Sequence, residues 1–328
     1  MTRSIPEAVR AKTVKLATEN PHAARRYLGE ALGLKKSQRN DMFKRVIGEA
    51  PAPKVSEVTA KPRKIRRLFL DIESSPNTVL TWRIGYKINL DHSNLLNERA
   101  IICVCYKWSD ESKVHYLHWD KNQSDKAMLV EVAKVLEQAD EIIGHNLARF
   151  DLPWLKTRAL FHGLPPLPDL KVVDTLQIAR RKFYFNSNRL DYLGKFLGFG
   201  GKIKTEFGLW KEIVLNRCPK AMRKMVEYCQ GDVLLLERVW KKLNHAAKPK
   251  SHAGVMSGGY KWSCPYDGGT NVVTNQRQVS AKGVLSWVMR CKDCGAHYTI
   301  SDSVHEEYLV EKPALARAKE VKSLSWRQ

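Results

Sequence analysis

The sequence contains no apolar run long enough to cross a bilayer, because the longest one, near Ile101–Cys105, is far shorter than about 20 residues. Met1–Lys12 lacks the apolar segment of a secretory signal, so we expect a cytoplasmic protein. The glycine-rich segment Gly198–Lys204 lacks the spacing G-x-x-x-x-G-K-[ST] of a nucleotide-binding P-loop. The seven cysteines are few and odd in number, which argues against a disulfide framework and favours free thiols or metal ligands.

Acidic residues are scarce relative to basic ones, since 34 Asp and Glu against 56 Lys and Arg give a net charge of +22. Residues 1–67 hold 17 basic and 6 acidic residues (+11), and residues 246–328 hold 12 and 7 (+5). Basic ends around a nearly balanced centre fit a partner made of phosphates, and nucleic acid is the leading candidate. A membrane surface is less favoured, because we find no strongly amphipathic basic helix with aromatic anchors.

Residues 1–49 are expected to form a small basic helical domain. Its helices are predicted at residues 6–18, 21–32 and 36–47, with Asn20 as a cap before Pro21. Gly33 interrupts the pattern in the manner of a helix-turn-helix. The helix that would meet DNA then begins with Lys35, Lys36, Ser37, Gln38 and Arg39. The alternative is a helical domain that only docks on the rest of the protein. Residues 50–66, with prolines and basic residues, are expected to be a linker.

The apolar run Arg67-Leu-Phe-Leu-Asp-Ile-Glu73 is rich in strand formers. Side chains alternate along a strand, so Phe69, Asp71 and Glu73 would share one face. Two carboxylates on one face of a buried strand repel each other unless a positive charge lies between them, and a divalent metal ion supplies one. The alternative is a strand that ends at Leu70 and leaves both acids in a solvated turn.

A domain of alternating strands and helices is expected over residues 67–246. Further strands are predicted at residues 100–108, 113–119, 141–146 and 170–174. Helices are predicted at residues 125–138, from 151 onward, and at 175–181, 189–197 and 219–243. Asp151 can be a simple N-cap with Pro153 in the first turn. The last helix places Tyr228 and Asp232 on an otherwise apolar face, and such local contradictions cluster at functional sites.

Two segments mix aromatic with basic side chains, which is typical of contacts that stack bases and hold phosphates. One is the long connection 74–99 and the other is the segment 180–185. The candidate nucleic-acid contacts are Trp82, Arg83, Arg181, Lys182 and Tyr184. For residues 74–99, a packed surface loop is an equally open alternative.

The order of elements and three motifs resemble the ribonuclease H-like fold and, within it, the DEDD superfamily of 3′-to-5′ exonucleases. The motifs are Asp71-Ile-Glu73, Asn146-Leu-Ala-Arg-Phe-Asp151 and Tyr228-Cys-Gln-Gly-Asp232. The tyrosine spacing assigns the DEDDy branch, because the histidine branch would have a histidine where this chain has Glu227. The resemblance covers roughly residues 67–243 and extends more loosely to stand-alone exonucleases of bacteriophage type.

The resemblance implies an α/β fold, with a mixed sheet flanked by helices, that carries out two-metal hydrolysis. The metal ligands would be Asp71, Glu73, Asp151 and Asp232, holding two Mg²⁺ or Mn²⁺ ions about 3.5–4 Å apart. Tyr228 would orient the attacking water or take its proton. Asn146 and Phe150 would support or pack against the ligands. Asp174 and Asp191 fall on no motif position and are interpreted as structural.

Residues 247–304 contain two knuckles, Cys264-Pro-Tyr-Asp267 and Cys291-Lys-Asp-Cys294, joined by strand-like residues. The pair resembles a zinc ribbon, a β module built around one structural Zn²⁺, except that Asp267 stands where the ribbon has a cysteine. Asp267 would then be the fourth ligand, with His252 or His297 as substitutes. Alternatively, the module has lost its metal and depends on packing. Basic residues that suggest DNA contacts here are Lys282, Arg290 and Lys292. Residues 305–328 are expected to form a helix and a basic tail.

Together these expectations favour a metal-dependent 3′-to-5′ exonuclease that hydrolyses terminal phosphodiesters of DNA, most simply at single-stranded 3′ ends, in replication, repair or recombination. A non-catalytic nucleic-acid-binding protein is the alternative from another class, and the complete set of motif residues argues against it. A 3′-to-5′ exoribonuclease acting on RNA is chemically equivalent, because the sequence contains no recognisable reader of the 2′-hydroxyl. A proofreading role would require a separate polymerase chain. If the protein is phage-encoded, its expected location is the host cytoplasm.

Overall fold

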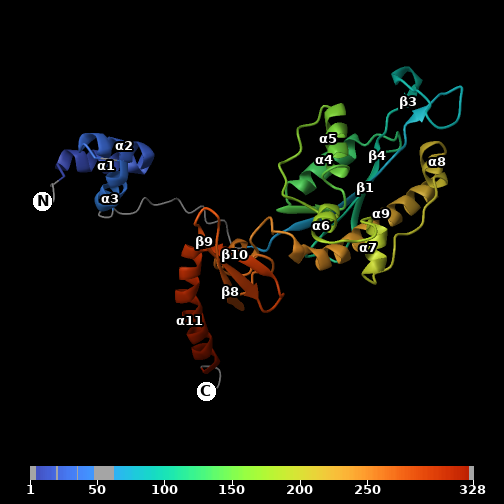
Figure 1. Ribbon diagram of the computed structural model, residues 1–328. Coiled ribbons are helices and arrows are strands. Elements are labelled where there is room, and N and C mark those ends of the chain that lie inside the picture. Colours follow the sequence, from blue (N-terminus) through green and yellow to red (C-terminus); the bar gives the residue numbers. More distant parts are fainter. Residues whose placement is uncertain (1–4, 20, 35, 48–62, 325–328) are drawn as a thin grey trace. The chain divides into compact units, whose positions relative to one another are not determined.

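The structure is a computed structural model that describes residues 5–19, 21–34, 36–47 and 63–324 (Figure 1). It divides into two compact units, Met1–Lys61 and Pro62–Gln328. Among the described residues, none of the helices has the length and apolar character that crossing a membrane requires.

Three helices form the described part of the first unit: α1 (Glu7–Glu19), α2 (Pro21–Ala31) and α3 (Lys36–Ile47). They pack around Ala24, Leu28, Phe43 and Val46. These helices agree with the expected ones to within one residue at each end. The expected cap at Asn20 and contact at Lys35 lie outside the described residues, as does most of the expected linker 50–66. The helix-turn-helix role therefore stays a prediction.

The second unit is built on a five-stranded mixed sheet with the order β5-β4-β1-β6-β7. Its strands are β1 (Arg67–Ser74), β4 (Ile101–Trp108), β5 (His115–His118), β6 (Glu141–Gly144) and β7 (Val172–Asp174). The central strand β1 runs antiparallel to β4 and parallel to β6. The expected mixed sheet is confirmed, and its central strand is the one that carries the acid pair.

Helices cover both faces of this sheet, as the alternation along β1 requires. Leu68, Leu70 and Ile72 pack with α4 (Lys126–Leu136) and α5 (Asp151–Phe161) on one face. Phe69 packs on the opposite face, against the cluster formed by the later helices. Those helices are α6 (Thr175–Lys182), α7 (Leu190–Phe196), α8 (Gly208–Val214) and α9 (Pro219–Leu243). Asp71 and Glu73 therefore belong to the α9 face of β1.

Helix α9 has the bounds expected from its apolar periodicity, with Pro219 in the first turn, where its missing N–H costs nothing. Its apolar face packs against β1 and β4. Helix α7 approaches closely at Gly194, where a Cβ would lie 2.5 Å from the Gly200 carbonyl oxygen and 2.8 Å from the Leu235 side chain. That close approach holds the glycine-rich segment after α7 against α9.

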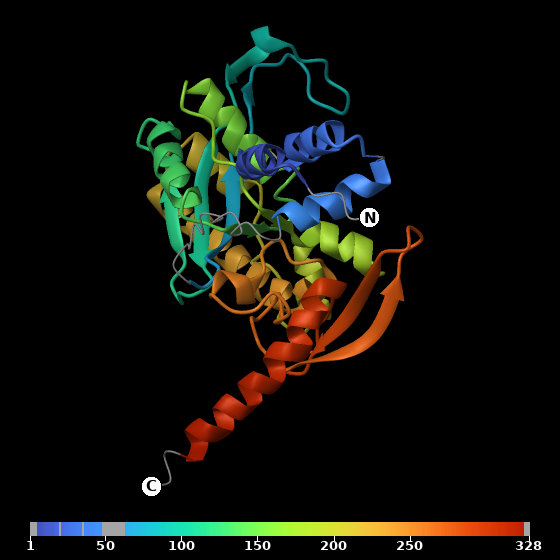
Figure 2. The same ribbon diagram turned by 90° about the vertical axis from the view of Figure 1, so that its left-hand side faces the viewer.

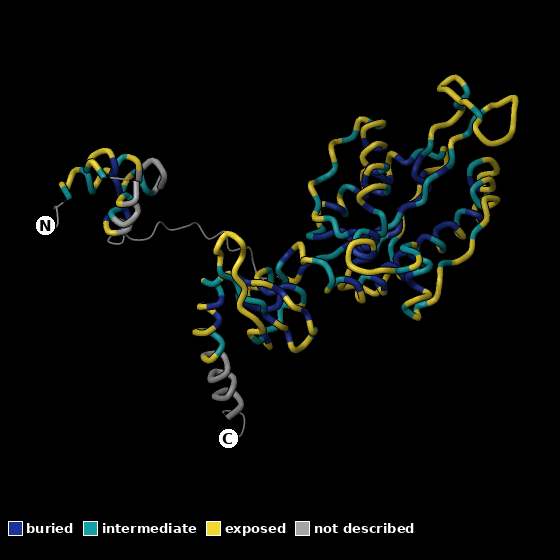
Figure 3. Tube along the Cα trace, in the orientation of Figure 1, coloured by how far each residue is buried: buried dark blue, intermediate teal, exposed yellow. Residues whose placement is uncertain are grey.

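Several elements were not expected from the sequence. The connection after β1 contains a short two-stranded sheet of β2 (Thr78–Val79) and β3 (Leu95–Asn97), with a 3-10 turn at His92–Asn94. The loop between these strands is exposed over most of its length (Figure 3). Helix α8 was also missed, and its Trp210 Nε1 donates a hydrogen bond to the Ser74 carbonyl oxygen at 3.1 Å. Helix α8 thereby anchors the end of the central strand.

The C-terminal part of the second unit is a β module followed by a helix (Figure 2). After a 3-10 turn at Asn244–Ala246 and α10 (Ala253–Met256), three antiparallel strands follow in the order β10-β9-β8. They are β8 (Val272–Val279), β9 (Leu285–Cys291) and β10 (His297–Ser301). Trp262, Val272 and Met289 lie in its core. Helix α11 (Asp302–Leu324) begins three residues before the expected start.

Candidate metal centre

Strand β1 and helix α9 bring three acidic side chains together. Asp71 and Glu73 extend from the second half of β1, and Asp232 extends from the middle of α9. One carboxylate oxygen of each lies within 4.8 Å of the others. Because β1 continues through Ser74, the alternative in which the strand ends at Leu70 is wrong.

Asp151 lies beside this group, at the start of α5. It is 3% exposed, and its Oδ1 accepts a hydrogen bond from the Ile72 amide at 3.2 Å, between the two acids of β1. The charge of Asp151 raises the pKa of the Asp71 carboxyl, which places the two groups in electrostatic contact. Asp151 is not an N-cap, because Phe150 occupies that position and its side chain makes no capping hydrogen bond. Its side chain is thus available to the site.

Burial raises the pKa of all four acids, and repulsion by the other acids of the site adds to the shift for Asp71 and Glu73. Burial raises the pKa of Asp71 well above its usual range, with further increases from the charges of Asp151, Glu73 and Asp232. Burial likewise raises the pKa of Glu73 to about 7 and that of Asp151 to about 7. It also raises the pKa of Asp232, although Lys202 opposes this. Such shifts arise where buried anions outnumber their cations, and they favour the binding of more positive charge.

Lys202 is the functional residue that sequence reasoning missed. Its Nζ donates a hydrogen bond to Asp232 Oδ2 at 2.6 Å, and its backbone amide donates to Asp191 Oδ1 at 2.8 Å. Burial alone would lower the pKa of Lys202, but the charges of Asp232 and Asp71 raise it above its usual range. The available signal was the basic, glycine-rich segment 198–204, for which the sequence pattern only excluded a P-loop. The lysine supplies one positive charge to a site with four acids.

The residues of this site fit a divalent metal. Asp232 Oδ1 is buried and has no hydrogen-bond partner among the described residues, while Oδ2 is held by Lys202. A buried carboxylate oxygen without a partner is costly, and hard cations such as Mg²⁺ and Mn²⁺ take oxygen ligands. Asp71, Glu73 and Asp232 are placed to hold such an ion together, with Asp151 alongside.

Tyr228 lies one helical turn before Asp232, and Lys202 Nζ donates a hydrogen bond to its Oη at 3.4 Å. Burial, followed by the charge of Asp232, raises the pKa of Tyr228 to about 12, so the phenol stays protonated near neutral pH. The next residue, Cys229, directs its thiol to Asp71, with Sγ 3.5 Å from the carbonyl oxygen and 3.6 Å from Oδ2. Cys229 and two thiols of β4, on Cys103 and Cys105, are buried in the apolar cluster beneath the site. We interpret the three thiols as part of the core.

Asn146 and Phe150, the expected supporting residues, lie in different environments. Asn146 has a backbone φ of +73° and lines a cavity of about 620 Å³ together with Lys202. Arg180 and Arg189 line the same cavity, and most of its other lining residues have polar side chains. Phe150 instead packs against the apolar cluster between the sheet and α5. The Asn146 cavity therefore shares Lys202 with the carboxylate site, whereas Phe150 has a packing role.

Asp174 and Asp191, the two aspartates that fall on no motif position, have structural roles, as expected. Asp174 caps α6 by accepting hydrogen bonds from the amides of Leu176 and Gln177. It also accepts from the Asn146 amide at 3.0 Å, which fixes the backbone of that residue. Asp191 pairs with Lys195 at 2.6 Å and holds the backbone of Lys202.

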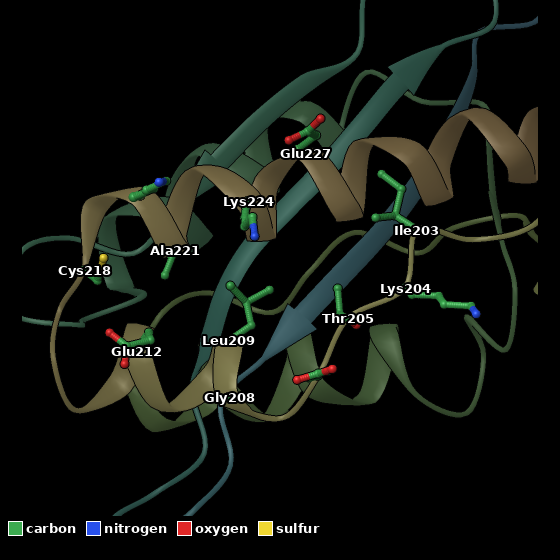
Figure 4. A pocket seen from close by; sticks show the side chains of 12 residues that line it. Ile203, Lys204, Thr205, Gly208, Leu209, Glu212, Cys218, Ala221, Lys224 and Glu227 are labelled. Carbon is green, nitrogen blue, oxygen red and sulfur yellow. The ribbon is translucent and has the colours of Figure 1, made fainter.

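A second cavity of about 610 Å³ lies between the segment 203–212 and the first half of α9 (Figure 4). Three lysines and three glutamates line it, so its charges balance. None of the four acids of the metal centre lies among its lining residues. This cavity is therefore separate from the carboxylate site.

The expected nucleic-acid contacts are exposed on two separate segments. Trp82 is 103% exposed and Tyr184 is 106% exposed, and Arg83, Arg181 and Lys182 are also exposed. Exposed apolar side chains that cluster mark interaction surfaces, and Leu80, Ile84 and Tyr86 are exposed in the same segment as Trp82. The first segment carries Trp82 on the β2–β3 loop. In the second, Arg181 and Lys182 belong to the last turn of α6, and Tyr184 follows the helix.

The two knuckles of the C-terminal module fold into the same turn. In the first, the Gly268 amide donates to the Cys264 carbonyl oxygen at 2.8 Å, and in the second Gly295 donates to Cys291 at 3.0 Å. The two glycines have φ values of +79° and +75°, a left-handed conformation that favours glycine. Two equivalent turns therefore present the side chains of both knuckles to a common point.

The four residues expected to bind zinc form one cluster. The ligand atoms of Cys264, Asp267, Cys291 and Cys294 all lie within 4.8 Å of one another. His252 is engaged elsewhere, because its Nδ1 accepts from the Val255 amide and its Nε2 bonds to the Lys261 carbonyl oxygen. Neither His252 nor His297 belongs to the cluster. Three thiols and one carboxylate are a donor set that suits a tetrahedral Zn²⁺.

A mixed sheet with helices on both faces and acids on its central strand defines the class, an α/β protein with a ribonuclease H-like fold. The chain belongs to the RNase_H superfamily, whose family model matches residues 68–244. Members of this superfamily are typically nucleases and generally use divalent metals, which is consistent with the carboxylate cluster found here.

The chain is also similar to a solved structure, the family B DNA polymerase from the hyperthermophilic archaeon Pyrobaculum calidifontis. The two are 15% identical, with a TM-score of 0.44, over 67% of this chain and 32% of the polymerase. The chain thus spans about a third of the length of that polymerase. A search of curated proteins finds no match.

Proposed function

We propose that the protein is a metal-dependent 3′-to-5′ exonuclease of the DEDDy type, which hydrolyses terminal phosphodiesters of DNA. The observation that carries this proposal is the convergence of Asp71, Glu73 and Asp232, with Asp151 beside them. The three DEDDy motifs of the sequence supply these same four acids. Membership of a superfamily of nucleases supports the reaction class.

The four acids would hold two Mg²⁺ or Mn²⁺ ions. When bound, such ions lower the pKa of a water and stabilise charge on the leaving oxygen. Lys202 favours the ionised form of Asp232 and orients its carboxylate before metal binds, because its ammonium contacts Oδ2 directly. Tyr228 keeps its proton near neutral pH, so it would orient the attacking water by a hydrogen bond rather than act as the base.

The substrate strand would be held by the exposed aromatic and basic side chains of the two segments 74–99 and 180–185. Trp82 and Tyr184 can stack on bases of any sequence, and the neighbouring Arg83, Arg181 and Lys182 can contact phosphates. This arrangement favours a single-stranded 3′ end. Roles in replication, repair or recombination, and any partnership with a separate polymerase chain, follow from this activity as proposals.

The C-terminal module would bind one structural Zn²⁺ through Cys264, Asp267, Cys291 and Cys294. Its core is small, so a metal that cross-links the two knuckles would contribute directly to its folding. The matching turns of the two knuckles support this proposal.

The proposed activity is tested with a single-stranded DNA oligonucleotide labelled at its 5′ end. With Mg²⁺ we expect a ladder that shortens from the 3′ end, and its loss in chelator and in Asp71→Asn. Glu227→Gln is the matched control, because Glu227 precedes Tyr228 on α9 but is exposed and faces the separate cavity. The same assay with an RNA oligonucleotide of the corresponding sequence decides whether the enzyme degrades DNA or RNA.

A ladder that persists unchanged in Asp71→Asn would assign the activity to a contaminant. Binding of the oligonucleotide without degradation, in both DNA and RNA, would instead favour a non-catalytic nucleic-acid-binding protein.

A further inference from the structure

A third large cavity, of about 610 Å³, lies in the C-terminal part of the second unit, away from the metal centre. It is formed by residues 248–252, by Lys261 and the first cysteine knuckle, and by β10. Its wall is fixed by hydrogen bonds, since Tyr266 Oη donates to the Ala247 carbonyl oxygen at 2.9 Å and Tyr298 Oη to that of Trp262 at 2.6 Å. The cavity is thus part of the folded module.

In the described part of the chain, the lysines that line this cavity are not balanced by any acidic lining side chain. Lys248, Lys250 and Lys261 contribute three exposed ammonium groups, and none of the described residues that line it is Asp or Glu. None of these lysines forms an ion pair with a described residue. A fourth ammonium adjoins it, because Lys171 Nζ donates to Ser251 Oγ at 3.2 Å, and Ser251 lines the cavity. By contrast, the cavity of Figure 4 is lined by three lysines and three glutamates, so its charges balance.

Like charges gathered around a concave surface repel one another and raise the local concentration of anions. Between the lysines lie Ser251, whose hydroxyl can donate a hydrogen bond, and the exposed imidazole of His297. This combination of ammonium groups and neutral donors is the chemistry that binds phosphate oxygens.

We propose that this cavity is a second binding site for the backbone phosphates of the nucleic acid, apart from the site that cuts it. The inference rests on the proposed exonuclease function for the identity of its ligand. An adjoining small cavity shares Lys248 and Lys250 and is lined by Arg67, the first residue of β1. Glu73 lies six residues further along that strand, on the order of 20 Å away. Only a strand longer than a few nucleotides can therefore reach both sites.

The test compares the full-length protein with a triple variant, Lys248→Gln, Lys250→Gln and Lys261→Gln. The control removes the same charge elsewhere, with Lys113→Gln, Lys121→Gln and Lys156→Gln, which are exposed and line none of the three large cavities. Binding of a single-stranded DNA of about 20 nucleotides is measured in chelator at several salt concentrations, and hydrolysis of a dinucleotide is measured with Mg²⁺.

Each phosphate contact to a single strand contributes about 0.7 to the slope of log affinity against log salt, so three lost contacts lower the slope by about 2. We expect this change, and an affinity loss of roughly 100-fold near 0.1 M salt, in the cavity variant and not in the control. Dinucleotide hydrolysis should be equal in all three proteins. The triple Lys→Arg variant at the same positions should keep the wild-type slope, because it keeps the charges.

An unchanged slope in the cavity variant, or an equal change in the control, would overturn the proposal. Binding of tripolyphosphate is measured on the same proteins. If the cavity variant loses tripolyphosphate binding but keeps oligonucleotide binding, the proposal is also overturned, because the cavity would then take small anions only. These outcomes are independent of the exonuclease proposal. If the wild type and the cavity variant differ in slope as expected but the wild type never degrades DNA, the exonuclease proposal is refuted and the proposed phosphate site is retained.

Discussion

Replacing Lys202 by methionine should destabilise the metal-free protein much more than the metal-loaded one. Among the described residues, Lys202 is the only cation that forms a hydrogen bond with any of the four acids. Its Nζ lies 2.6 Å from Oδ2 of Asp232, whose side chain is 1% exposed. Breaking a fully buried ion pair costs about 3–5 kcal/mol. The lysine side chain is 30% exposed and the acids can take up protons, so we expect a smaller loss of about 2 kcal/mol.

A loss of about 2 kcal/mol corresponds to a fall in Tm of about 4–8 °C for a domain of this size. The assay is thermal melting of the wild type and Lys202→Met near pH 8, in chelator and with saturating Mn²⁺. Once metal neutralises the carboxylates, the ammonium is no longer needed, so the two proteins should melt within about 2 °C of each other. Lys195→Met is the control, because Lys195 lies in the same region but pairs with Asp191 instead of Asp232.

The reasoning would be refuted if Lys202→Met lost the same Tm in chelator and in Mn²⁺, because the lysine would then act through packing alone. An effect no larger than that of Lys195→Met would refute it as well.

Three further predictions follow from the site, the exposed loop and the module. The folded-state pKa of Glu73 and of Asp151 is raised to about 7, from ordinary values of 4.5 and 3.8, so the folded metal-free protein binds more protons than the unfolded chain in that window. Its stability should therefore fall as pH rises from about 4 to 8, by at most about 3 kcal/mol for Glu73 and about 4 kcal/mol for Asp151, and Mn²⁺ should reverse the trend in Tm. Trp82→Ala should weaken single-stranded DNA binding by about 1–3 kcal/mol through lost stacking, measured by titration, whereas Tyr116→Ala, which removes an exposed ring on β5, should not. Metal analysis of the purified protein should find one Zn²⁺ per chain, Cys291→Ser should lose it, and Asp267→Cys should hold it more tightly against chelator; a protein free of zinc with a fully folded module would contradict this.

Local patterns in the sequence were sufficient to predict the elements that carry the acids. The alternation along β1 placed Asp71 and Glu73 on one face, and the apolar spacing of α9 predicted its bounds from Pro219 to Leu243. Both elements have strong periodicity and are long or buried enough for local preference and tertiary packing to agree. The three motifs then identified Asp151 and Asp232 as residues that belong together.

The parts that sequence reasoning missed depend on contacts between distant segments. Lys202 precedes Asp232 by thirty residues, and nothing in a glycine-rich segment predicts which lysine enters the site. Helix α8 has only seven residues and is stabilised by contacts such as the one from Trp210 to the end of β1. Short elements of this kind follow from tertiary packing more than from propensity. The basic cavity likewise combines lysines from two segments with β10.

The central claim is that four acids from β1, α5 and α9 form one site for two divalent cations. The chelator-treated protein is titrated with Mn²⁺, and the free ion is measured by electron paramagnetic resonance. This gives the number of Mn²⁺ ions bound per chain. We expect two Mn²⁺ per wild-type chain, and at most one after Asp232→Asn, with Glu227→Gln unchanged. A wild-type chain that binds none, or an Asp232→Asn chain that still binds two with the same affinity, would contradict the account.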